Sequence, residues 1–314
     1  MTREMLCKQV DTVMRAFAFE GEIREYRPFG NGHINDTYLV TAGEKRFILQ
    51  RVNSYVFPKP EEVVSNIVHV TDYLRGIIEK EGGDPLRETL TLVPTQTGEY
   101  FVYDPEGGLW RMYLFIEDTI SRDLPDTPEL FELSGEAFGR FQRQIGSFPA
   151  DTLFETIHDF HNTPARYQQL EDAIARNEAG RLSEVGEEVA FCRKYEREVH
   201  VLLDALAAGD IPLRVTHNDT KLNNVLLDAK TGRGVCVIDL DTVMPGLAAY
   251  DFGEIEALYR ELRFVRRYEL IYSRGCILDK RTIEENLSGS YSYPAREENH
   301  ILSAIAGRDA KQAE

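Results

Sequence analysis

The sequence predicts an α+β fold with two lobes, one rich in strands and one mainly helical. Alternating apolar and polar residues dominate the first part of the chain, and apolar residues at helical spacing dominate the second. A short acidic stretch, Glu117-Asp118, separates the two patterns. The length of 314 residues also suits two domains of roughly 150 residues each. We therefore place one lobe at 1–117 and the other at 118–314, and we expect a cleft between them.

The first lobe begins with a predicted amphipathic helix over 5–19 and continues as a mostly antiparallel sheet. Pro58 and Pro60 end the third strand, because proline cannot donate to a sheet. Helical spacing then predicts one inserted helix over 61–78. The predicted strands of this lobe cover residues 23–26, 33–40, 46–52, 89–93, 99–103 and 109–116.

The second lobe is predicted to contain helices around a few short strands. Most of the densely clustered polar residues lie between or directly after these strands, where functional loops are expected on a rigid scaffold. The predicted helices cover residues 128–145, 166–177 and 185–208, and the predicted strands cover 213–216, 225–228 and 234–240.

The composition is that of a globular protein with a strongly acidic balance. Apolar residues make up 42% of the chain and charged residues 28%, which permits a packed core. The 36 basic and 53 acidic residues give a net charge of −17, which repels nucleic acids and anionic membranes, so we expect neither as a partner. No apolar run reaches the ~20 residues of a membrane helix, and the N-terminus is unlike a signal peptide, so we expect a cytoplasmic protein. The composition predicts no oligomeric state.

Two polar clusters of the second lobe carry the candidate chemistry. The first, 217–224, places a carboxylate, an ammonium group and carboxamides in one loop between strand-forming residues. The second is an apolar strand that ends in Asp239 and Asp241, which project from the same face if the strand continues. Two carboxylates this close are costly unless a cation lies beside them. A plain hydrophilic hairpin is the alternative interpretation of the first cluster.

The spacing within 217–224 matches the H-R-D-x-x-x-x-N loop of protein kinases, in which the Asp receives the acceptor proton and the Asn holds Mg²⁺. By this match Asp219 is the catalytic base and Lys221 faces the transferred phosphoryl group. Asn224 and Asp239 bind Mg²⁺, which prefers oxygen ligands. Asp251 opens an Asp-Phe-Gly tripeptide that no apolar strand precedes, so we interpret it as a structural carboxylate that braces the loop.

At these residues the chain resembles the aminoglycoside phosphotransferase and choline kinase superfamily, which has the bilobal protein-kinase-like fold. The similarity is greatest to the N-acetylhexosamine 1-kinases and extends over about residues 20 to 253. The strings that carry it are 29–38, similar to a nucleotide loop, 47–53, similar to a third strand, 113–119, similar to a hinge, and 159–163, 217–224, 237–246 and 250–253.

The resemblance implies an ATP- and Mg²⁺-dependent kinase that phosphorylates the anomeric hydroxyl of GlcNAc or GalNAc to the sugar 1-phosphate. It implies that Gly30 and Gly32 let backbone amides approach the ATP phosphates. Arg51 is expected to contact those phosphates through its bidentate fork, with Gln50 on the opposite face. Backbone groups near Glu117 are expected to receive the adenine edge.

The same resemblance implies a sugar acceptor site formed by both lobes. His33 is expected to reach the sugar from the nucleotide loop, and Asp219 and Thr220 contact it from the catalytic loop. Arg281 and Tyr293 belong to a later segment that resembles the part of the family lining the sugar site.

Two other functions are compatible with the sequence. The first is a kinase for a cationic acceptor such as choline or an aminoglycoside, which a net charge of −17 favours. The absence of tryptophan from the second lobe argues against an aromatic cage for such a cation. The second is a nucleotide-binding scaffold without turnover, because the 61 residues after Gly253 form a shorter tail than the family usually has.

Overall fold

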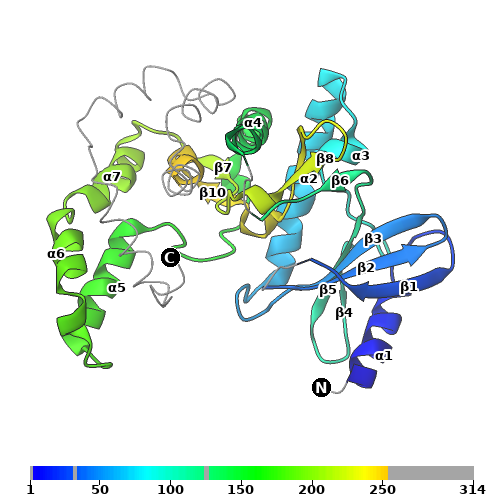
Figure 1. Cartoon of the computed structure of the whole chain (residues 1–314), viewed down its shortest axis with the longest axis horizontal. Coiled ribbons are helices and arrows are strands. Elements are labelled where there is room, and N and C mark those ends of the chain that lie inside the picture. The colour runs from blue at the N-terminus through cyan, green and yellow to red at the C-terminus, as the bar shows by residue number, and fades with distance from the viewer. Residues whose placement is uncertain (1–2, 31–33, 124–126, 254–314) are drawn as a thin grey trace.

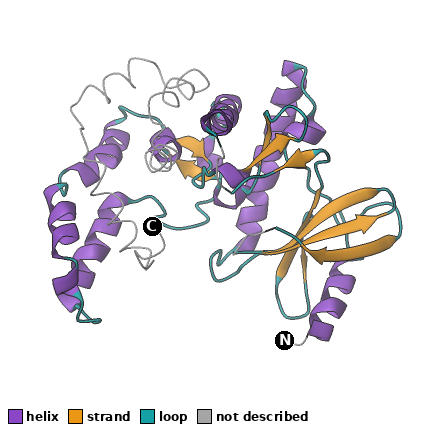
Figure 2. Ribbon diagram, in the orientation of Figure 1, coloured by secondary structure: helices purple, strands orange, loops and turns teal. Residues whose placement is uncertain are grey.

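The computed structural model describes residues 3–30, 34–123 and 127–253, and these residues form two lobes (Figure 1). Strands gather in the first lobe and helices in the second, which confirms the predicted fold class (Figure 2). The first lobe contains helices α1 (Arg3–Met14), α2 (Pro60–Glu81) and α3 (Pro85–Glu88) and strands β1 (Ile23–Pro28), β2 (Asp36–Ala42), β3 (Lys45–Arg51), β4 (Val102–Tyr103) and β5 (Leu109–Leu114).

The five strands form one antiparallel sheet in the order β1-β2-β3-β5-β4, and its two faces pack against different cores. Phe47 and Leu49 on β3 pack in the core that includes residues of α1. Ile48, on the opposite face, packs against the core that contains α2 and residues of the second lobe. Because side chains alternate along a strand, Gln50 shares the face of Ile48, toward the second lobe.

Helix α2 connects the two lobes. Its apolar residues belong to the same core as residues of α4, β8 and β9. Asn66, which is only 1% exposed, donates from Nδ2 to the carbonyls of Phe154 at 2.8 Å and Val243 at 2.9 Å. The Asn66 Oδ1 also accepts from the Phe154 N–H at 2.9 Å. These bonds fix the position of second-lobe backbone relative to the first lobe.

The second lobe surrounds two small sheets with helices. Strand β7 pairs with β10, and β8 pairs with β6 and β9, all antiparallel. Helices α5, α6 and α7 lie on the side of this lobe away from the five-stranded sheet (Figure 1). The elements are β6 (Thr119–Ile120), α4 (Pro128–Ile145), η1 (Ala150–Thr152), α5 (Thr163–Arg176), η2 (Leu182–Glu184), α6 (Gly186–Lys194), η3 (Glu198–His200), α7 (Val201–Ala208), β7 (Arg214–Thr216), η4 (Leu222–Asn224), β8 (Val225–Asp228), β9 (Gly234–Val237), η5 (Leu240–Thr242) and β10 (Met244–Gly246).

Several predicted elements have other bounds in the structure, and two of them differ most. The single helix predicted over 185–208 is interrupted, so that α6 ends at Lys194 and α7 begins at Val201. Neither α6 nor α7 contains a buried residue, so packing does not enforce a continuous helix. The stretch 89–93 contributes only an isolated bridge between Leu92 and Tyr113 instead of a strand.

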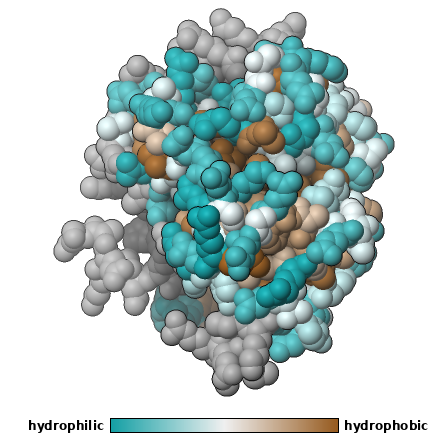
Figure 3. All heavy atoms as spheres, turned by 90° about the vertical axis from the view of Figure 1, so that its right-hand side faces the viewer, coloured by the Kyte–Doolittle hydropathy of each residue, from teal (hydrophilic) through white to brown (hydrophobic). Residues whose placement is uncertain are grey.

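The face of the molecule in Figure 3 is largely polar. Hydrophilic side chains cover most of the face in Figure 3, with smaller hydrophobic areas between them. In the part of the chain that the structure describes, no helix is long and apolar enough to cross a membrane.

Candidate active site

Asp219 lies at the centre of a hydrogen-bonded group in the loop after β7. The Nδ2 of Asn224 donates to the backbone oxygen and to Oδ2 of Asp219, both at 2.8 Å. The Lys221 Nζ is also 2.8 Å from Asp219 Oδ2. The Asp219 side chain is 24% exposed and that of Lys221 is 44% exposed, so both can meet a ligand. The structure thus brings together three residues that the sequence selected.

His217 ties this loop to the loop that follows β9. Its fully buried ring donates from Nε2 to the Ile238 carbonyl at 2.9 Å and accepts at Nδ1 from the Asp219 N–H at 3.3 Å. These two partners assign the tautomer with the hydrogen on Nε2. The Ile238 N–H in turn donates to the Asn224 carbonyl at 2.8 Å. The two polar clusters of the sequence are therefore adjacent in space.

Asp251 braces the catalytic loop, as predicted. This fully buried carboxylate accepts from the backbone N–H groups of His217 at 2.9 Å and Asn218 at 2.7 Å. The side-chain amide of Gln142, on α4, also donates to it. Asn218 has a left-handed backbone with φ of 62°, which these bonds hold in place.

Asp239 lies at a sharp turn after β9, and its φ of 61° is also in the left-handed region. The strand therefore does not continue to Asp241, and the expectation that both carboxylates project from one strand face is wrong. Desolvation by the surrounding protein, together with the nearby Asp241 and Asp219 carboxylates, raises the pKa of Asp239 from 3.8 to about 6, although the residue remains exposed to solvent. His217 and Arg111 oppose this rise in pKa. A carboxylate with other carboxylates close by is stabilised when a cation binds to it.

Both oxygens of Asp241 already have partners from the first lobe. The Arg111 Nη2 donates to Oδ1 at 2.5 Å, and the Asn35 Nδ2 donates to Oδ2 at 2.7 Å. Gln50 accepts from Arg111 Nη2 at 2.9 Å and thereby orients the guanidinium. The sequence predicted a cation beside Asp239 and Asp241. For Asp241, this cation is the guanidinium of Arg111.

The oxygen atoms that Asn224 and Asp239 leave available are suitable ligands for Mg²⁺. Asn224 uses its Nδ2 to bond Asp219, so its amide oxygen is the atom it offers to a metal ion. Together with the carboxylate of Asp239 it offers oxygen ligands only, which suits a hard divalent cation.

Residues 25–263 match the family model described as the phosphotransferase enzyme family, and this span is most of the chain. The chain belongs to the phosphotransferase enzyme family. It is thus a phosphotransferase in the superfamily of the aminoglycoside phosphotransferases and choline kinases, as the sequence motifs indicated.

Solved structures of this kind share the fold at low sequence identity. The structure of a microcompartment-associated aminopropanol kinase has a TM-score of 0.56 and 17% identity, and the match covers 97% of this chain and 94% of that one. An aminoglycoside phosphotransferase from Alicyclobacillus acidocaldarius has a TM-score of 0.54 and 14% identity, with 94% and 81% covered. A spectinomycin phosphotransferase in complex with ADP and spectinomycin has a TM-score of 0.50 and 13% identity, with 98% and 94% covered.

In this phosphotransferase, Arg51 and Gln50 on β3 lie on the opposite faces of the sheet from those expected. Arg51 is not brought to Asp219 or Asp239. Its Nε lies 3.5 Å from Asp104 Oδ2, on the face that packs away from the second lobe. Gln50, expected to point away, instead faces the Asp241 cluster through Arg111. Each face of β3 carries both apolar and polar residues, so the sequence pattern does not show which face is turned toward the second lobe.

Arg111, Asn35 and Gln50 are the site residues that sequence reasoning missed. Arg111 is a charged residue within an otherwise apolar stretch, 109–116, and it is only 1% exposed. A charge inside a predicted core strand is the signal that could have identified it, because such a residue needs a buried partner.

The other predicted site residues of the phosphotransferase lie as follows. Gly30 has a φ of 79°, which favours glycine, and among the described residues, its chain neighbours apart, no atom lies within 4 Å of where a Cβ would be. The Glu117 carboxylate pairs with Arg46, and its carbonyl accepts from Arg87 at 2.9 Å. Thr220 is 2% exposed and donates its hydroxyl to the Asp251 carbonyl at 3.0 Å. Gly32, His33, Arg281 and Tyr293 lie outside the described residues.

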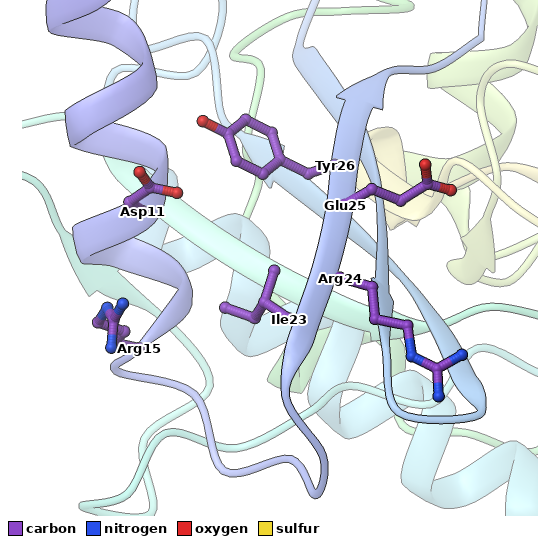
Figure 4. A pocket seen from close by; sticks show the side chains of 6 residues that line it. All are labelled: Asp11, Arg15, Ile23, Arg24, Glu25 and Tyr26. Atoms are coloured by element: carbon purple, nitrogen blue, oxygen red, sulfur yellow. The ribbon is translucent and has the colours of Figure 1, made fainter.

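A separate cavity of about 330 Å³ lies between α1 and β1 (Figure 4). Asp11 and Arg15 border it from α1, and Ile23 and Tyr26 point toward it from β1. None of the residues in the Asp219 and Asp239 group lines this cavity, so it takes no part in the site.

Proposed function

We propose that this phosphotransferase uses ATP and Mg²⁺ to phosphorylate the anomeric hydroxyl of an N-acetylhexosamine, giving the sugar 1-phosphate. The observation that carries the transfer chemistry is the grouping of Asp219, Lys221, Asn224 and Asp239 around two adjacent loops. The sugar class rests on the resemblance of 217–224 and 237–246 to the N-acetylhexosamine 1-kinases.

Asp219 is the group that orients the acceptor. Its Oδ2 is held by Lys221 and Asn224, so Oδ1 is the oxygen presented to the acceptor hydroxyl. As the acceptor oxygen bonds to the γ-phosphorus, the bond from that phosphorus to the ADP oxygen breaks and the hydroxyl proton passes to Asp219. Lys221 stabilises the charge that spreads over the transferred oxygens. Mg²⁺ on Asp239 and Asn224 would offset the phosphate charge.

The nucleotide is proposed to bind between the lobes 1–117 and 118–314. Gly30 offers its backbone to the phosphates, and Gly32 belongs to the same loop. The segment that contains Glu117 joins the lobes and is proposed to contact the adenine through its backbone. His33, Arg281 and Tyr293 are proposed to contact the sugar.

The direct test is an assay of ADP release from MgATP with GlcNAc and with GalNAc. We expect ADP and sugar 1-phosphate in equal amounts with at least one of them, and neither with the Asp219→Asn variant. If neither sugar releases ADP above the acceptor-free rate at millimolar concentration, the sugar assignment is wrong.

A small alcohol that carries an amine is the second candidate acceptor. The net charge of −17 attracts cations, and two of the proteins with similar folds are an aminopropanol kinase and an aminoglycoside phosphotransferase. Including choline, an aminopropanol and an aminoglycoside in the same assay distinguishes this candidate. If ATP stabilises the protein but no acceptor yields ADP, the protein is a binding scaffold.

A further inference from the structure

The segment that follows Asp239 is held by three side chains of the first lobe. Arg111 and Asn35 bond the two oxygens of Asp241, and Asn66 bonds the Val243 carbonyl. The loop that carries Asp239 is hydrogen-bonded to the loop that carries Asn224, so these contacts with the first lobe act on both loops. Their placement thus depends on the position of the five-stranded sheet and α2.

The Arg111–Asp241 contact is the ion pair among these three links. Arg111 is 1% exposed and Asp241 is 4% exposed, so water screens their attraction little. Gln50 accepts from both Nε, at 3.2 Å, and Nη2 of Arg111, which fixes the plane of the guanidinium. The guanidinium also lies over the ring of Tyr113, 5.3 Å from its centroid. The contacts with Asp241, Gln50 and Tyr113 together fix the orientation of the Arg111 guanidinium.

Asn35 extends this link to the proposed nucleotide loop. It lies within the string 29–38 that resembles a nucleotide loop, directly before β2. Its Oδ1 accepts from the Asn53 N–H at 3.0 Å while its Nδ2 bonds Asp241. A continuous path therefore runs from the end of the nucleotide loop through Asp241 to Asp239, two residues away.

We propose that the Arg111–Asp241 pair, with Asn35, is a positioning device that couples the nucleotide loop to the metal ligand Asp239. Asp241 is then a positioning residue and not a metal ligand, since its two oxygens are used by the first lobe. Nucleotide bound to the first lobe and Mg²⁺ bound at Asp239 strengthen each other's binding through this pair. The inference rests on the proposed function.

The test replaces the pair by apolar residues, Arg111→Met together with Asp241→Leu. Replacing a buried ion pair by apolar residues of similar size is often neutral for stability, whereas removing one partner leaves a buried charge. We expect the double variant to melt near the wild-type temperature and to bind ADP without metal within about twofold of the wild type. We expect the strengthening of ADP binding by Mg²⁺ to fall about 10-fold, and kcat to fall about 10- to 100-fold, as for other groups that orient metal ligands.

An exposed ion pair that also joins the two lobes supplies the control. Arg143 on α4 pairs with Glu81 on α2 at 2.5 Å, and their side chains are 45% and 36% exposed. The double variant Arg143→Met with Glu81→Leu should keep the wild-type response to Mg²⁺. Isothermal titration of ADP, with and without Mg²⁺, measures this response in all three proteins.

The results separate this inference from the proposed function. If the Arg111 and Asp241 double variant keeps the wild-type response to Mg²⁺, the pair is only structural and the inference is overturned. If the wild-type protein itself does not bind ADP, the proposed function fails and this inference fails with it. Should the double variant not fold, Asn35→Ala removes one bond to Asp241 without stranding a charge, and we expect it to reduce the Mg²⁺ effect about threefold.

Discussion

At the residue scale, two aspartates of one segment have opposite environments. Asp239 lies near the carboxylates of Asp241 and Asp219, and desolvation by the surrounding protein together with these charges raises its pKa to about 6, although the residue is exposed. Asp241 is buried and has a guanidinium and an amide on its two oxygens. Environment therefore assigns the roles, because one carboxylate needs a cation and the other already has one.

The raised pKa of Asp239 predicts that Asp239→Asn stabilises the metal-free protein at neutral pH. The folded protein holds this proton more tightly than the unfolded chain, whose carboxyl has a pKa near 3.8. Stability therefore falls as pH rises from about 4 to about 6 and stays lower above that range. Asn does not ionise, so the variant avoids this loss of stability at pH 7.5, which solvent screening keeps small because Asp239 is exposed.

Thermal unfolding with a metal chelator at pH 5 and pH 7.5 checks this prediction. The stabilisation by Asp239→Asn should be clearly larger at pH 7.5, where wild-type Asp239 is ionised. An equal stabilisation by Asp239→Asn at the two pH values would show that the pKa of Asp239 is not raised in the folded protein.

Asp219→Asn is predicted to remove phosphoryl transfer while keeping the nucleotide site. The amide cannot accept the acceptor proton, and loss of a general base costs about 100-fold or more in kcat. ADP affinity should stay within about threefold of the wild type, because the side chain faces the acceptor. The exposed Asp151 on η1 offers a control in Asp151→Asn, which should change neither quantity. Turnover near the wild-type rate in Asp219→Asn would reject the base assignment.

At the element scale, the catalytic loop is held in place by the carboxylate of Asp251, which in turn is hydrogen-bonded to helix α4. Asp251 receives two consecutive backbone N–H groups and the Gln142 amide of α4, so it fixes the loop between β7 and η4. A loop of this length has no sheet or helix hydrogen bonds of its own, and a buried N–H without a partner is costly.

Asp251→Asn is predicted to destabilise the protein and to slow catalysis. The new amide group places N–H donors against the backbone N–H groups of His217 and Asn218, so at least one loses its acceptor. We expect a loss of about 1 to 3 kcal/mol in unfolding free energy and a lower kcat, because Asp219 is the next residue of that loop. Urea unfolding and steady-state kinetics measure both effects, and a variant as stable as the wild type would contradict the bracing role.

The sequence predicted the bounds of some helices and strands correctly and those of others incorrectly. Helix α4 and strand β8 have the predicted bounds, since helical spacing or strong strand residues coincide with clear capping or turn residues there. The helix predicted over 185–208 is broken because its residues are not buried, which periodicity alone does not report. The Asp219 loop was found from spacing, whereas Arg111 and Asn35 were missed because their partner Asp241 lies more than 100 residues away.

At the scale of the whole molecule, α2 and the Arg111–Asp241 pair join the lobes through a shared core and buried polar contacts. Most of the strands and the polar loops lie where local sequence patterns predicted them. The relative position of the two lobes depends on contacts between residues distant in sequence, which local patterns do not report. The acidic charge of the whole chain is a different kind of property, because it acts on a ligand before any contact forms.

The net charge of −17 predicts how salt affects the acceptor. Raising ionic strength from about 0.01 M to about 0.15 M shortens the Debye length from about 30 Å to about 8 Å, which removes long-range attraction for a cation. An N-acetylhexosamine is neutral, so we expect its KM at saturating MgATP to be the same at both ionic strengths. A cationic alcohol such as choline, if it is phosphorylated at all, should show a KM that rises several-fold with salt. A sugar KM that rises as steeply as that of choline would mean that the salt acts on the protein and not on the ligand, and would contradict this prediction.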